Sequence, residues 1–147
     1  QAEAIWAVRD HSEHAETEAG PTITFDVSLP IGQMADYVAA VRTELEGQGR
    51  KPGCFVFGHL GDGNLHFMVP ADVEDPQDRH RVERAVYEPL APLKGSVSAE
   101  HGIGLEKRNW LHLSRSDAEL DVMRAMKAAL DPGNILNRGK VLPAQSG

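Results

Sequence analysis

The chain has 147 residues, 41% of them hydrophobic and 25% charged, a length and composition that suit one globular domain with its own core. The net charge of −7 argues against a nucleic-acid or anionic-membrane partner, because both bind through basic patches. No apolar run approaches the roughly 20 residues of a membrane span. The N-terminus lacks the features of a signal peptide, so we expect a cytoplasmic location.

Hydrophobic periodicity predicts alternating helices and strands along the chain. Residues 2–18 read as a helix whose pattern is already under way at the first residue, which indicates a piece of a longer protein. The remaining elements are a strand at 22–30, a helix at 33–46, short strands at 54–59 and 65–70, a helix after Pro76, and helices at 106–112 and 116–130. This order predicts an α+β fold, with an antiparallel sheet, helices on one face (ferredoxin-like) and C-terminal helices.

The two short strands flank the stretch "GHLGDGNLH", which holds two histidines. Asp62-Gly63 is a strong signal for a two-residue type I′ hairpin turn, and this turn would place His59 directly opposite His66. Opposed residues have Cβ atoms about 4.5–5.5 Å apart, so we expect both rings on one side, within about 5–7 Å of each other. Two imidazoles so placed can share a metal ion. The alternative is a pair of surface histidines beside a glycine-rich turn.

A second polar cluster occurs in "SAEHGIG", residues 98–104. Glu100 could join the two histidines as a carboxylate ligand while leaving coordination positions open. His101 could act as a base beside the metal, since a free imidazole titrates near roughly pH 6.5. A solvated Glu-His pair in a loop is the alternative.

Four stretches together resemble the C-terminal part of the FAD-linked oxidases of the vanillyl-alcohol-oxidase type, in their D-2-hydroxyacid dehydrogenase branch. They are "FDVSLP" at 25–30, "GHLGDGNLH" at 58–66, "GSVSAEHGIGLEKR" at 95–108 and "MRAMKAALDPGNILNRGKVLP" at 123–143. The resemblance implies that residues 1–147 form the substrate or cap domain. The family's FAD-binding domain precedes this region and is absent from the chain, so we expect the chain alone to bind FAD poorly and not to turn over.

Residue roles follow from the resemblance position by position. His59, His66 and Glu100 match the ligands of a divalent metal such as Zn, Mn or Fe, and His101 matches the general base. Asn137 matches an asparagine near the flavin ring, and Arg9 falls where relatives hold the substrate carboxylate. The implied partners are FAD, a small 2-hydroxyacid and an electron acceptor.

Two positions depart from the hydroxyglutarate-oxidising members of this branch. Thr24 stands where they carry a lysine, and Met68 stands where we expect an asparagine. Both changes remove polar groups, which favours a less polar 2-hydroxyacid.

Two other classes of protein remain open on the residues themselves. A zinc hydrolase also uses two histidines and a glutamate, although the helical H-E-x-x-H of such enzymes does not occur here. A folded, non-catalytic module is the other class. In any of these cases we expect the chain to fold by itself, with Trp6 and Trp110 shielded from water.

Overall fold

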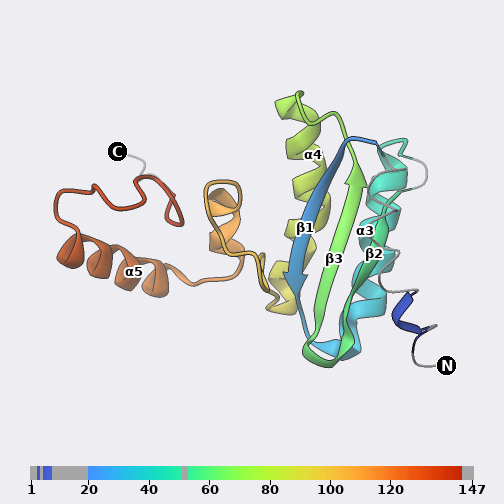
Figure 1. The fold of residues 1–147 in the computed structure, drawn as a ribbon, viewed down its shortest axis with the longest axis horizontal. Helices are drawn as coiled ribbons and strands as arrows, with labels where there is room; N and C mark the ends of the chain where they lie inside the picture. The colour runs from blue at the N-terminus through green and yellow to red at the C-terminus, as the bar shows by residue number, and fades with distance from the viewer. Residues whose placement is uncertain (1–2, 4, 8–19, 51–52, 144–147) are drawn as a thin grey trace.

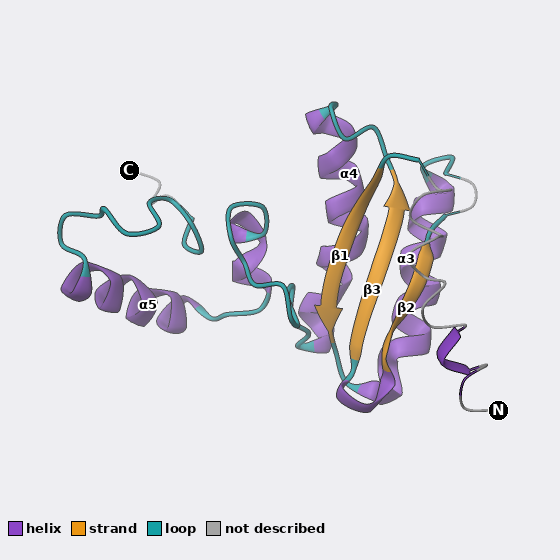
Figure 2. Cartoon of the chain, viewed as in Figure 1, coloured by secondary structure: helices purple, strands orange, loops and turns teal. Residues whose placement is uncertain are grey.

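A three-stranded antiparallel sheet is the centre of the molecule, and two helices cover one of its faces (Figures 1 and 2). The computed structural model describes residues 3, 5–7, 20–50 and 53–143. The strands are β1 (Thr22–Ser28), β2 (Phe55–His59) and β3 (Asn64–Pro70), and the α-helices are α3 (Met34–Gly47), α4 (Pro76–Tyr87) and α5 (Asp117–Leu130). Short 3₁₀ helices occupy Ile31–Gln33, Leu60–Asp62, Glu88–Leu93 and Arg108–Leu113. The predicted α+β class is confirmed.

The strand order is β1-β3-β2, with β3 antiparallel to both neighbours. This is the order of a ferredoxin-like sheet without its fourth strand. The free edge of β1 is met by one bridge, in which Ser28 and Ser96 exchange backbone hydrogen bonds of 3.1 and 2.7 Å. The segment after Ser96 therefore runs beside β1 and brings the distant "SAEHGIG" stretch to the sheet.

The core lies between the sheet and the helices α3 and α4. Alternate residues of β1 and β3 point into it, as the period of two in their sequences predicts, and they pack on the apolar stripe of α3. Each such side chain gains about 1.5–3 kcal/mol when it is fully buried. The Tyr37 hydroxyl, deep in this core, donates to the Val86 carbonyl at 2.6 Å. Because this face is filled by the core, the other face of the sheet is available for polar side chains.

The helix boundaries follow local signals in the sequence. Asp75 caps α4 by accepting from the Gln77 N–H, with Pro76 at the first position. Ser116 and Glu119 form a capping box at the start of α5. The helix expected at 106–112 is a 3₁₀ helix, Arg108–Leu113.

The two tryptophans differ in exposure. Trp110 is 8% exposed, as expected, and its indole N–H donates to Glu83 at 3.0 Å. Trp6 is 60% exposed, so the expectation that it is shielded was wrong. The core between the sheet and α3 and α4 is filled without it. Most of the helix expected at 2–18 lies outside the described residues.

The C-terminal part, α5 and residues 131–143, extends away from the sheet (Figure 1). Its apolar side chains are largely exposed, at 58–80%: Val122, Met126, Leu130, Ile135 and Leu136. None of the helices in the described ranges is both long enough and apolar enough to cross a bilayer.

Candidate functional site

The face of the sheet opposite α3 and α4 presents three short rows of side chains across its strands. Cross-strand pairing places them in the order β1, β3, β2, as Thr24–Met68–Phe55, Asp26–His66–Phe57 and Ser28–Asn64–His59. The two histidines thus lie on one face, in neighbouring rows.

The hairpin register differs from the predicted one. His59 pairs with Asn64, and His66 pairs with Phe57, so the two histidines are diagonal rather than opposed. The loop is a 3₁₀ turn at Leu60–Asp62 followed by Gly63, in place of a two-residue Asp-Gly turn. The pairing is displaced by two positions, and this keeps each side chain on its face. The expectation of nearby rings on one side is confirmed, with ring centroids 5.7 Å apart.

Gly63 explains why the loop closes in this way. Its φ of 73° lies in the left-handed region, and a Cβ there would meet the Leu29 carbonyl oxygen at 2.2 Å. The Gly63 carbonyl in turn accepts from the Leu29 N–H at 3.0 Å. The glycine therefore ties the hairpin to the end of β1 and fixes the position of His59.

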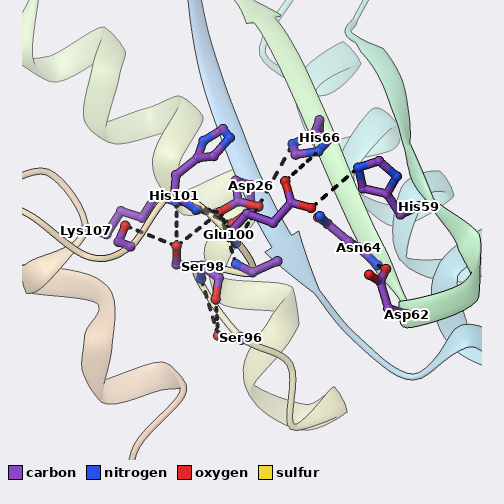
Figure 3. A network of polar contacts seen from close by, with 12 residues as sticks. Asp26, His59, Asp62, Asn64, His66, Ser96, Ser98, Glu100, His101 and Lys107 are labelled. Atoms are coloured by element: carbon purple, nitrogen blue, oxygen red, sulfur yellow. Dashed lines mark hydrogen bonds and ion pairs between the residues drawn. The ribbon is translucent and has the colours of Figure 1, made fainter. Parts of the chain in front are cut away.

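Glu100 reaches both histidines from the segment beside β1 (Figure 3). Its Oε1 lies 3.5 Å from His59 Nε2, and its Oε2 lies 3.7 Å from His66 Nε2. These distances exceed those of ordinary hydrogen bonds. They are close to the roughly 3–3.5 Å that separates two ligand atoms bound about 2.0–2.2 Å from one ion. The three residues thus fit a divalent metal ion.

The three side chains differ in exposure. His66 is 10% exposed, whereas His59 and Glu100 are 45% and 47% exposed. Burial lowers the pKa of His66, against the opposing effect of Asp26 and Glu100. A neutral imidazole keeps the lone pair that a metal needs. The cluster is therefore anchored at His66 and open to solvent at its other two members.

Asp26, which the sequence analysis did not single out, organises the turn that carries Glu100. It is fully buried, and its Oδ2 accepts from the backbone N–H groups of Ala99, Glu100 and His101 at 3.1, 2.9 and 2.8 Å. The Ser98 hydroxyl donates to the same oxygen at 3.1 Å. A carboxylate at a central position of the predicted first strand was the available signal, and the structure places it directly opposite His66.

The charge of Asp26 is balanced by Lys107, whose ammonium lies 3.4 Å from Oδ2 and is also buried. Burial alone raises the pKa of Asp26, but the N–H groups of His101 and Glu100, the Lys107 charge and the Ser98 hydroxyl outweigh it and bring the pKa to about 2. Asp26, His66 and His101 also lie close enough to share an ion. Because Asp26 is already engaged by these donors, the cluster with Glu100 is the better metal site.

His101 lies on the Asp26 side of His66. The two rings stack, with centroids 5.5 Å apart and planes at 21°. His101 is exposed, so its ring is accessible to a small molecule. The structure thus brings together four of the predicted site residues, His59, His66, Glu100 and His101.

The other two predicted residues are not part of this cluster. Asn137, with a φ of 46°, belongs to residues 131–143, the segment that extends away from the sheet. Its expected position near a flavin stays a prediction. Arg9 lies outside the described residues.

Comparison with known proteins identifies the family of the chain. The model of the FAD linked oxidases, C-terminal domain, matches residues 1–141. The chain belongs to this family. Among its relatives, D-2-hydroxyglutarate dehydrogenase, mitochondrial, of Danio rerio is 39% identical over 140 residues, 95% of this chain and 26% of that protein. D-2-hydroxyglutarate dehydrogenase of Stutzerimonas stutzeri (strain A1501) is 32% identical over 98% of this chain and 32% of that protein.

A third relative has a different named activity. The D-2-hydroxyglutarate–pyruvate transhydrogenase of Saccharomyces cerevisiae is 36% identical over 94% of this chain and 29% of its own length. The chain therefore spans between a quarter and a third of these relatives. The expected cytoplasmic location stays a prediction.

Proposed function

We propose that this chain is the substrate-binding part of an FAD-dependent dehydrogenase that oxidises a D-2-hydroxyacid. The observation that carries the proposal is the meeting of His59, His66 and Glu100, which come from a hairpin and from a segment far along the chain. Their donor set of two imidazoles and one carboxylate suits Zn, Mn or Fe and leaves coordination positions for substrate oxygens. Family membership supports FAD as the partner cofactor.

The proposed chemistry divides the work between the chain and its cofactors. A metal ion held by His59, His66 and Glu100 would supply Lewis-acid polarisation of the α-hydroxyl, and the flavin would be the hydride acceptor, since no side chain can accept a hydride. His101, exposed and stacked on His66, takes the hydroxyl proton at a ring nitrogen. Asp26 holds the backbone of Glu100 and His101, so that ligand and base keep a fixed separation. Arg9 is the proposed partner of the substrate carboxylate.

The flavin is proposed to be held mainly by a part of the protein outside these residues. The relatives are three to four times longer than the stretch they share with the chain. The exposed apolar side chains of α5 and residues 131–143 are a surface that another domain would cover. Asn137 lies in this same part, which supports its proposed place near the flavin ring.

The proposed substrate is less polar than hydroxyglutarate. Thr24 and Met68, the two departures from the hydroxyglutarate-oxidising pattern, are cross-strand partners in the row next to His66. The outer strand adds Phe55 and Phe57, which are 40% and 39% exposed. Met68 is fully buried, so Phe55 and Phe57 are the side chains that present apolar surface beside the proposed metal ligands. The three strands carry no lysine or arginine that could pair with a second carboxylate.

Metal binding by the chain itself tests the proposed site. Isothermal titration with Mn²⁺ or Zn²⁺ should show one equivalent bound to the wild-type chain and none to His66→Ala, because the anchored ligand is lost. His112→Ala is the matched control, since His112 is exposed and its Nδ1 lies 2.9 Å from the Asn109 carbonyl, in the 3₁₀ helix Arg108–Leu113. Wild-type protein that binds no metal, or equal loss in both variants, would refute the site.

A further inference from the structure

Asn64 has a buried side-chain amide that the chain does not satisfy. The residue is 2% exposed, and within the described part of the chain neither its Oδ1 nor its Nδ2 has a hydrogen-bond partner. Buried amides are normally hydrogen-bonded, because an unpaired one loses its hydration without compensation. The backbone N–H of Asn64 donates to Asp62 Oδ1 at 3.2 Å, and the side-chain amide takes no part in this bond. The hydrogen bonding of the hairpin turn therefore does not explain why a polar amide is buried at this position.

The position of this amide relates it to the metal ligands. Asn64 is the cross-strand partner of His59 and precedes His66 by two residues on the same face of β3. Figure 3 shows its side chain directed toward the carboxylate of Glu100. That carboxylate already faces His59 and His66 through one oxygen each. A carboxylate oxygen has two acceptor positions, so each oxygen can bind an ion and still accept an N–H.

We propose that Asn64 is a positioning residue of the metal site, whose Nδ2–H donates to Glu100 and holds its carboxylate in the ligating orientation. The proposal rests on the metal site described above and adds a residue to it. The amide atoms are closed to solvent whereas Glu100 is 47% exposed, so Asn64 acts through Glu100 and not by binding a ligand itself. A small rotation of Glu100 toward a bound ion would supply the missing partner of Nδ2.

A residue kept for such a role should cost stability when the metal is absent. Asn64→Leu keeps a similar volume and removes the unsatisfied amide. We expect metal-free Asn64→Leu to melt at a higher temperature than the wild-type chain, and to bind Mn²⁺ or Zn²⁺ about 10–100-fold more weakly. If Asn64 had only a structural role, Asn64→Leu would lower the melting temperature and leave the metal affinity unchanged.

The test is thermal melting of the metal-free chains and isothermal titration with Mn²⁺ or Zn²⁺. Ser28 is the cross-strand partner of Asn64 on β1, whereas His59 is its partner on β2. Ser28→Ala is the control and should keep wild-type metal affinity. Asn64→Ala gives a second measure of the affinity loss if the leucine variant does not fold. Unchanged affinity in the Asn64 variants, with a wild type that binds metal, overturns the role of Asn64 alone. A wild type that binds no metal overturns this role and the metal site together.

Discussion

Replacing Glu100 by alanine in the flavin-containing protein should remove the metal and the turnover together. Glu100 supplies the one negative charge of the proposed ligand set, and it is the member that reaches both histidines, at 3.5 and 3.7 Å. Replacing His101 by alanine should instead keep the metal and lower turnover by about 10²–10⁴-fold, the usual contribution of a general base. An imidazole bound to metal through its lone pair cannot take a proton, so the two neighbours have separate roles.

Elemental analysis of the purified variants, together with their steady-state rates, measures this division. His112→Ala should match the wild type in both quantities, because His112 lies in the 3₁₀ helix Arg108–Leu113 and not at the site. If metal content fell equally in the Glu100 and His101 variants, His101 would be a further ligand. The cluster of Asp26, His66 and His101, whose ligand atoms lie within 4.8 Å of one another, would then be the better metal site.

Replacing Asp26 by asparagine should weaken metal binding by about 10–100-fold, although Asp26 touches no metal in this account. The asparagine can place its one oxygen where Oδ2 accepts from Ala99, Glu100 and His101, but it carries no charge. Its NH₂ group would then stand in place of Oδ1 and face the Glu100 N–H and His66. The turn that carries Glu100 is therefore held less firmly. Asp26→Ala should also destabilise the fold by about 3–5 kcal/mol, because it leaves the buried Lys107 without its counter-charge.

Asp78 offers a matched control for this prediction. Its carboxylate is also buried and accepts from Arg50, from Arg81 at 2.8 Å and from the Asp72 N–H at 2.9 Å. Burial raises its pKa, but these partners outweigh burial and bring the pKa to about 2, as for Asp26. Asp78→Asn should lower the melting temperature and leave metal affinity unchanged. Equal losses of affinity in the two asparagine variants would mean that general destabilisation, and not the turn, sets the affinity.

The fold was largely predictable because its signals are local. The alternation in β1 and the stripe of α3 identify the faces that bury the core, and proline and glycine mark the boundaries. The approach of His59 to His66 was also predictable, although the register was not. A displacement by two positions preserves the faces, so the conclusion did not depend on the turn type assumed for Asp62-Gly63.

The rest of the site depends on contacts between distant segments, which periodicity does not report. Asp26 reads as an ordinary polar residue of a half-exposed strand until the segment after Ser96 is placed beside β1. Asn64 likewise reads as a turn residue until the burial of its amide is known. The expectation for Trp6 failed because an apolar helical pattern does not specify what covers it.

We propose that this chain presents a metal-bound D-2-hydroxyacid to a flavin. The most direct measurement is anaerobic flavin reduction in a protein that joins this chain to its flavin-binding part, followed by rapid-mixing absorbance. A D-2-hydroxyacid with an apolar side chain should bleach the flavin in the metal-loaded protein, faster than D-2-hydroxyglutarate does. Removal of the metal by a chelator should abolish bleaching, and added Mn²⁺ or Zn²⁺ should restore it. A flavin that stays oxidised with every D-2-hydroxyacid would rule out the proposed reaction. Bleaching that survives in His59→Ala, His66→Ala and metal-stripped protein alike would rule out the role of the metal.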